Sequence, residues 1–364
     1  SLKEDLTRHI WSDEWLESKS IIDKCPDLVR IPLSVLGDTA LHLAVTGERL
    51  EIVKELVNRM RLEDMLIPNC LGDTALHLTV KIGSLEIVKE LVECMRPEDM
   101  LIPNSDGDTA LHLAVKIGSL EIVEELVKRM RPEDMLIPNS FGETAFHLAV
   151  TGGRLEIVNE LVKRMRPEDM LIPNFFGDTA LHLAVKRERL EIVNELVKRV
   201  RPEDMLIPNS FGDIALHLAV YFDSLEIVKE LVKRMRPEDM LKPNSDGDTT
   251  LHLAADRGRL EIVKELVKRM RPKDMLIPNS AGDTALHLTV KIGSLEIVNE
   301  LVERMRPEDM LIPNSDGMLP VHLAALYRSK RSIVDILSSQ KILDKMDFKD
   351  IERLFMMTIR YDMF

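Results

Sequence analysis

Gly107-Asp108-Thr109-Ala110-Leu111-His112-Leu113-Ala114 is the stretch that decides the fold of this chain of 364 residues. A recognisable copy of it returns every 35 residues from Gly37 to Gly317, nine copies in all. A fixed period between about 20 and 50 residues is typical of a solenoid, in which each unit buries its apolar face only against its neighbours. The sequence therefore predicts one elongated domain made of repeated units.

Each unit is predicted to be a turn followed by two helices. Gly107 suits a tight turn that needs positive φ, and Thr109 is a suitable cap for the first helix. Gly118 ends that helix, and a second helix is expected to begin near Ser119. Its apolar residues form one stripe, while the glutamates between them face water. The stripe consists of Leu120, Val123, Val127 and Met130.

The stretch from Thr109 to Ala114 resembles the ankyrin repeat, whose signature is Thr-Pro-Leu-His-x-Ala after a glycine turn. Alanine replaces the proline here, and it is a good helix former that loses little at this position. The period is 35 rather than about 33, and the linker 131–139 accommodates the two extra residues outside both helices. The resemblance implies an all-α ankyrin-repeat solenoid of about ten stacked helix-turn-helix units with turns at their tips.

The segments outside the regular repeats are predicted to be caps. Residues 1–36 lack the motif and read as a degenerate N-terminal capping repeat, with short helices over Leu6–Trp11 and Glu14–Asp23. We expect Trp11 and Trp15 to cover the end of the core there. Residues 37–316 hold eight repeats of period 35, and residues 317–340 form a C-terminal capping repeat.

Residues 341–364 are expected to form a trailing helix, with an amphipathic stretch over Phe348–Met357. Phe355, Met356 and Phe364 leave this end apolar, which suggests the start of a missing continuation.

Composition limits the classes of partner and compartment. The formal net charge of -13 argues against a nucleic-acid partner, because phosphate binding requires a basic footprint. Cys25, Cys70 and Cys94 form no metal-ligand or disulfide pattern, which favours a reducing, cytoplasmic environment. No apolar run approaches the roughly 20 residues of a membrane helix, and residues 1–5 show no signal-peptide core.

A narrower resemblance is to plant ankyrin proteins in which the ankyrin domain precedes a C-terminal membrane domain, the accelerated-cell-death-type or PGG-domain group. Three kinds of segment carry it: residues 25–30 before the first motif, the Arg-Pro-Glu-Asp-Met-Leu linkers, and residues 347–354 near the end. This resemblance implies a cytoplasmic domain of a membrane protein in defence or stress signalling.

One histidine per repeat is the most conspicuous candidate for metal chemistry. Stacked helices lie roughly 8 to 10 Å apart, whereas zinc requires ligands about 2 Å from one centre. We therefore predict hydrogen bonds to neighbouring turns, with no metal and no cofactor. No Gly-rich phosphate loop and no nucleophile with a base and an orienting group occur, which predicts a non-enzymatic chain. The histidines are His42, His77, His112, His147, His182, His217, His252, His287 and His322.

An acid precedes the capping position in eight repeats, and two interpretations stay open. These acids favour the positive end of the helix that follows them, or they form a negative stripe that attracts a basic partner. They are Asp38, Asp73, Asp108, Glu143, Asp178, Asp213, Asp248 and Asp283.

The candidate binding residues are aromatic side chains and one leucine at variable positions, namely the turn tips and the ends of first helices. Clustered exposed aromatics are typical of interfaces, so we predict a protein or peptide partner, apolar with basic neighbours, on the concave face. Packing of these rings on one another, or self-association, is the alternative use of this surface. The predicted site consists of Leu71, Phe141, Phe175, Phe176, Phe211, Tyr221 and Phe222, flanked by Glu143, Asp178 and Asp213.

Three functional interpretations follow from the sequence. The first is a protein-interaction scaffold. The second is a cytoplasmic regulatory or sensor domain of a membrane protein, and the third is a consensus or engineered repeat array without a natural partner.

Overall fold

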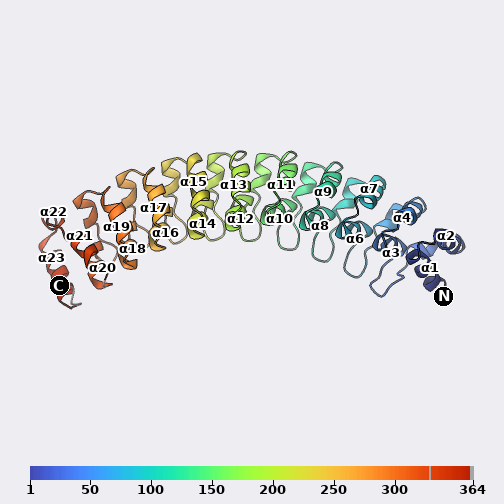
Figure 1. Ribbon diagram of the computed structural model, residues 1–364, viewed down its shortest axis with the longest axis horizontal. Coiled ribbons are helices and arrows are strands. Elements are labelled where there is room, and N and C mark those ends of the chain that lie inside the picture. Colours follow the sequence, from blue (N-terminus) through green and yellow to red (C-terminus); the bar gives the residue numbers. More distant parts are fainter. Residues whose placement is uncertain (328, 361–364) are drawn as a thin grey trace. The chain divides into compact units, whose positions relative to one another are not determined.

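The computed structural model describes residues 1–327 and 329–360, and all regular structure in these residues is helical (Figure 1). The predicted all-α fold of repeated helix pairs is therefore confirmed. The chain divides into two compact units, Ser1–Phe175 and Phe176–Phe364.

The repeat that begins at Gly107 shows how the sequence builds each helix pair. α8 (Ala110–Ile117) follows Thr109, whose backbone N–H donates to His112 Nδ1 at 3.1 Å. The helix ends at Gly118, where φ is 78°, a left-handed conformation that glycine adopts without strain. α9 (Leu120–Val127) then begins after Ser119. The predicted turn and helical hairpin are confirmed.

The linker between repeats contains a short helix that the sequence did not predict. Residues 131–139, which the sequence placed outside both helices of the pair, contain a 3₁₀ helix, η3 (Pro132–Leu136). Arg131 donates from Nε and Nη2 to the two carboxylate oxygens of Asp134, at 3.1 and 2.9 Å. Met135 is buried. The linker therefore contributes to the core as well as connecting the repeats.

Within the first unit, each first helix packs beside the first helix of the next repeat, and each second helix beside the next second helix. The remaining elements of this unit are α1 (Leu2–Trp11), α2 (Trp15–Lys24), η1 (Pro26–Val29), α3 (Ala40–Thr46), α4 (Leu50–Val57), α5 (Leu62–Met65), α6 (Ala75–Ile82), α7 (Leu85–Cys94), η2 (Pro97–Leu101), α10 (Ala145–Thr151), α11 (Leu155–Val162) and η4 (Pro167–Leu171).

The second unit repeats the same packing, with α12, α14, α16, α18 and α20 in one row and α13, α15, α17, α19 and α21 in the other. Its elements are α12 (Ala180–Lys186), α13 (Leu190–Val197), η5 (Pro202–Leu206), α14 (Ala215–Tyr221), α15 (Leu225–Arg234), η6 (Pro237–Leu241), α16 (Thr250–Asp256), α17 (Leu260–Val267), η7 (Pro272–Leu276), α18 (Ala285–Ile292), α19 (Leu295–Val302), η8 (Pro307–Leu311), α20 (Pro320–Leu326), α21 (Arg331–Leu337), α22 (Gln340–Leu343) and α23 (Phe348–Arg360).

The N-terminal helix pair differs from the prediction in which residues cover the core. α1 and α2 form where short helices were expected, but Leu6 and Ile10 are the fully buried residues of α1. Trp11 is 44% exposed, because successive helical residues point about 100° apart and Ile10 already faces the core. The guanidinium of Arg59 lies 5.6 Å from the ring centroid of Trp15. The expected covering role of Trp11 is therefore wrong.

At the other end, α23 begins at Phe348 as expected and continues to Arg360. It packs against α20, and the backbone carbonyl of Asp350 accepts a hydrogen bond from His322 Nε2 at 2.9 Å. Phe355 and Met356 are exposed. Phe364 lies outside the described residues. The boundaries of the caps and the single-domain interpretation stay predictions.

The turn at Gly107 yields a stability prediction. A Cβ on Gly107, where φ is 76°, would lie 2.5 Å from the backbone nitrogen of Ser140 in the next turn. We expect Gly107→Ala to lower the free energy of unfolding by about 2 to 4 kcal/mol, from backbone strain and the displaced turn. Chemical denaturation of the full chain measures the loss.

Gly83→Ala is the matched control, because Gly83 has φ of 84° and nothing within 4 Å of an added Cβ. The Gly83→Ala variant introduces backbone strain without a steric clash, so we expect its free energy of unfolding to fall by only about 1 to 2 kcal/mol. Equal losses for the two variants would contradict the close approach of the turns.

Candidate functional site

In most repeats a buried histidine ties the repeat to the turn of the next, whereas His147 and His217 donate to the linker carbonyls of Ile172 and Lys242. In α12, His182 Nδ1 accepts from the backbone N–H of Thr179 at 3.1 Å, and its Nε2–H donates to the carbonyl of Asp213 at 3.0 Å. Because Nδ1 is an acceptor, the ring is neutral with its proton on Nε2. Burial lowers the pKa of His182, which favours this neutral form. Equivalent bonds, reaching the acid position of the next repeat, are made by His42, His77, His112, His252 and His287.

The predicted hydrogen-bonding role of these histidines is therefore confirmed. Among residues 1–327 and 329–360, no group of three or more His, Cys, Asp or Glu side chains is placed to hold a metal ion.

The repeated acids do not form one exposed negative stripe. Asp178 is 2% exposed, and its carboxylate accepts from Asn209 Nδ2 at 3.0 Å and pairs with Lys186 Nζ at 2.5 Å. The lysine lies eight residues after the acid, at the end of the helix that the acid precedes. Its charge neutralises the acid inside the repeat. The same pair forms between Lys81 and Asp73, Lys116 and Asp108, and Lys291 and Asp283.

The negative-stripe hypothesis is therefore wrong for these four acids. Asp178 was expected to flank the binding surface, but the structure uses its carboxylate in the interior of the repeat instead.

The predicted apolar site residues are all exposed. Leu71, Phe141 and Phe175 belong to the first unit, where the ring of Phe175 lies over Gly142 so closely that an added Cβ would be 2.4 Å from it. Glu143, in the same unit, is half-buried, and its carbonyl accepts from His112. Phe176, Phe211, Tyr221 and Phe222 belong to the second unit.

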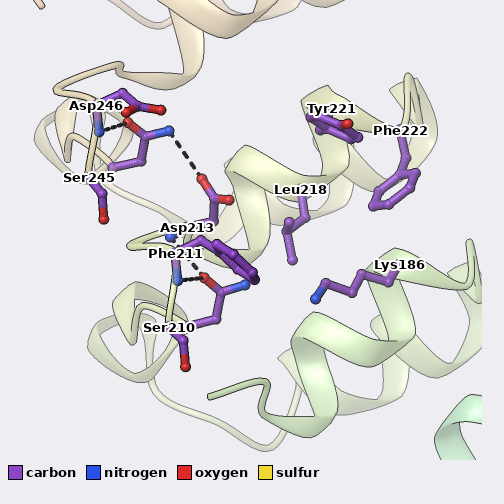
Figure 2. A pocket seen from close by; sticks show the side chains of 11 residues that line it. Lys186, Ser210, Phe211, Asp213, Leu218, Tyr221, Phe222, Ser245 and Asp246 are labelled. Atoms are coloured by element: carbon purple, nitrogen blue, oxygen red, sulfur yellow. Dashed lines mark hydrogen bonds between the residues drawn. The ribbon is translucent and has the colours of Figure 1, made fainter. Parts of the chain in front are cut away.

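An open groove of about 550 Å³ in the second unit brings Phe211, Tyr221 and Phe222 together (Figure 2). Phe211 comes from the turn before α14, whereas Tyr221 ends this helix and Phe222 follows it. The Tyr221 and Phe222 rings meet edge to face, with centroids 5.2 Å apart. Phe211 is 63% exposed, Tyr221 48% and Phe222 38%. The groove therefore presents a clustered aromatic surface to solvent.

Polar side chains complete the same groove. Lys186, Asp213 and Asp246 contribute to its lining, and Figure 2 shows Lys186 extending toward Phe211 and Leu218. The guanidinium carbon of Arg257 lies 3.9 Å from the ring centroid of Tyr221, within the range of a cation–π interaction.

The repeat at Gly212 lacks two features that other repeats use. Ile214 replaces the capping threonine, so only its backbone N–H donates to His217 Nδ1, at 3.1 Å. Tyr221 replaces the lysine eight residues after Asp213. The Asp213 carboxylate accepts from Asn244 at 3.2 Å, and no Lys or Arg of the described chain lies within 4.0 Å of it.

The negative charge of the Asp213 carboxylate is consequently only weakly compensated by its neighbours. Burial raises its pKa, and the negative charges of Asp246 and Asp178 act in the same direction. The hydrogen bond from Asn244 and the charge of Lys186 oppose this change. The side chain is 22% exposed, so it remains accessible from the groove.

Sequence reasoning missed Lys186, Asp246 and Arg257 as neighbours of the aromatic residues. The eight-residue spacing of acid and lysine in four repeats was a signal for the internal ion pair. The 35-residue period was the signal for Asp246 and Arg257, because they occupy in the next repeat the positions of Phe211 and Phe222.

The family comparison agrees with this architecture. Residues 19–95, 41–135, 125–207 and 181–275 match the family described as ankyrin repeats (3 copies), and residues 281–315 match the one described as ankyrin repeat. The chain therefore belongs to the ankyrin repeat family. No curated protein matches it. Ankyrin repeats generally act in protein–protein interaction and are typically non-catalytic. Across residues 1–327 and 329–360, no helix has both the length and the apolar character needed to cross a membrane.

The histidine bonds predict acid sensitivity. Burial lowers the pKa of His217 to about 4, whereas the unfolded chain titrates near 6.5. The stabilisation from the neutral ring is complete above pH 6.5 and is lost as the pH falls toward 4, because the unfolded state binds the proton first. We expect His217 alone to contribute a loss of about 2 kcal/mol between pH 7 and pH 5.

Urea unfolding over this pH range measures the effect through the transition midpoint. A midpoint that stayed constant or rose on acidification from pH 7 to pH 5 would refute the neutral, buried histidine.

Restoring the missing lysine tests the state of Asp213. Tyr221→Lys should pair with the carboxylate and lower the pKa of Asp213, which NMR titration of its side-chain carbon detects. Stability is a poor readout, because an ion pair of about 1 kcal/mol is offset by lost aromatic and cation–π contacts of similar size. An unchanged Asp213 titration would show that the lysine does not reach the acid.

Proposed function

We propose that the chain is a non-enzymatic scaffold that binds a partner protein or peptide through the aromatic groove of its second unit. The observation that carries the proposal is the exposure of Phe211, Tyr221 and Phe222 around one groove. A few residues supply most of the binding energy at protein interfaces, and large side chains such as Tyr and Trp are enriched among them.

The size of the aromatic surface sets the strength of binding. Covering about 100 Å² on each of the three side chains, at about 25 cal/mol per Å², supplies roughly 7 kcal/mol. Association costs at least about 4 kcal/mol in lost freedom of motion. The aromatics alone therefore support only weak binding, and a specific partner needs further contacts.

The charges around the groove favour a partner with basic residues. Lys186 is neutralised by Asp178, whereas no Lys or Arg of the described residues forms an ion pair with Asp213 or Asp246, and Asp213 lies only near the neutral His217. Complementary charge speeds association and rejects acidic partners. An apolar segment with basic neighbours fits this balance.

The wider predictions rest on the sequence. Leu71, Phe141, Phe175, Phe176 and Glu143 remain predicted partner contacts, and self-association remains an alternative use of the surface. Four further interpretations also stay predictions: the resemblance to plant PGG-domain proteins, a regulatory or sensor role in defence or stress signalling, a cytoplasmic location, and an engineered array.

Selection from a display library of random dodecapeptides tests the proposal, with the full chain as bait. We expect enriched peptides that combine apolar and basic residues. The double variant Phe211→Ser and Phe222→Ser should weaken their binding at least about tenfold, because it removes two of the three rings. Thermal unfolding should hardly change, since both side chains are exposed.

Ile292→Ser is the matched control, because Ile292 occupies the position of Phe222 in another repeat and is also exposed. Phe176→Ser tests the wider surface at the turn position equivalent to Phe211. Binding that survives the double variant, or falls equally with Ile292→Ser, would place the site elsewhere.

A further inference from the structure

Four repeats contain a defined position for an ammonium group beside the acid. Lys81, Lys186 and Lys291 each place Nζ at 2.5 Å from the Oδ2 atom of the acid eight residues earlier, and Lys116 makes the same pair with Asp108. In these repeats an asparagine of the next repeat donates to the other oxygen, Oδ1. The acid therefore receives one neutral donor and one cation on separate oxygens.

The repeat at Gly212 keeps half of this arrangement. Asn244 Nδ2 donates to Asp213 Oδ1 at 3.2 Å, but Tyr221 stands where the lysine would be. Asp213 lines the groove beside Phe211 (Figure 2). The ammonium position next to Oδ2 is consequently supplied by no side chain of this repeat, and it opens onto an aromatic surface.

We propose that a lysine side chain of the bound partner takes this position, with its ammonium on Asp213 Oδ2 and its methylene chain against Phe211 and Tyr221. The proposal rests on the proposed function of the same groove and names the partner residue that it recognises. In four other repeats a lysine of the chain itself forms this ion pair, whereas here the lysine comes from the partner.

A cation is required because a partner that covered Asp213 without pairing it would bury an uncompensated charge, which is costly. Lysine fits better than arginine. A guanidinium binds strongly when two carboxylate oxygens accept in parallel, but Asn244 already uses Oδ1. A single ammonium on Oδ2 is the contact seen in the other repeats.

The aromatic surface distinguishes this repeat from another that also lacks the lysine. In the repeat at Gly247, Asp248 is followed eight residues later by Asp256, and Asn279 donates to Asp248 Oδ1 at 2.8 Å. Its turn carries Asp246, and its first helix ends at Asp256 and Arg257, so no ring is present to hold an alkyl chain. Asp248 therefore serves as an internal control for the acid alone.

The test uses a lysine-containing dodecapeptide selected by the native full chain, together with its acetyl-lysine and arginine analogues. Calorimetry measures the dissociation constants. For the native chain we expect acetylation to weaken binding at least about tenfold, because it removes the charge, and arginine to bind less tightly than lysine. Asp213→Asn should bind the lysine and acetyl-lysine peptides equally.

Tyr221→Lys supplies the ammonium from the chain itself and should also abolish the preference for lysine, which protects the test if Asp213→Asn disturbs the turn. Asp248→Asn should keep the full preference. A preference for lysine that persisted in Asp213→Asn would overturn the inference. Selected peptides that need Phe211 and Phe222 but show no excess of lysine would overturn it while leaving the proposed function intact. Failure to select any peptide that depends on these rings would refute both.

Discussion

The hydrogen bond from a buried histidine to a backbone carbonyl, in most repeats that of the next turn, is the constraint on which the repeats of each unit depend. It requires a neutral ring, a donor at the capping position and a carbonyl at a fixed place, as in the bond from His182 to Asp213. The bond places the backbone of Asp213, and Asn209 and Asn244 then orient the turn and the carboxylate. Because none of these contacts involves the residue at the tip of the turn, that position is free to change without loss of the fold.

The repeat at Gly212 has an aromatic residue at this variable position, and it also lacks two stabilising contacts that other repeats make. With Ile214 in place of threonine, the repeat lacks the hydroxyl that contacts the histidine in other repeats. With Tyr221 in place of lysine, it lacks the cation that neutralises the acid. In return the repeat presents aromatic residues around Asp213. Departures from a consistent repeat pattern are expected at functional sites, because stability elsewhere compensates for them. The neighbouring repeat at Gly177, which keeps the histidine, asparagine and lysine contacts, contributes to that compensation.

The helix pairs follow from the sequence because their determinants are local: Gly118 ends a helix, Thr109 begins one, and apolar spacing selects the buried face. The exposure of Phe211, Tyr221 and Phe222 was likewise predictable from their positions in the repeat. The order within the linkers was not, because it depends on Met135 reaching the core. The ion pair that removes Asp178 from the surface, the position of Asp246 in the groove and the contact of Arg257 with Tyr221 depend on how helices and turns pack together. These contacts join residues from different segments, so no single stretch of sequence predicts them.

Hydrogen exchange of the full chain, with and without a selected lysine peptide, tests the central claim most directly. If the peptide occupies the groove, exchange slows in residues 209–222 and 244–246, while the second helices α15 and α17 exchange as before. Protection centred on α15 and α17, or confined to the first unit, would contradict the assignment of the partner site to the groove around Asp213.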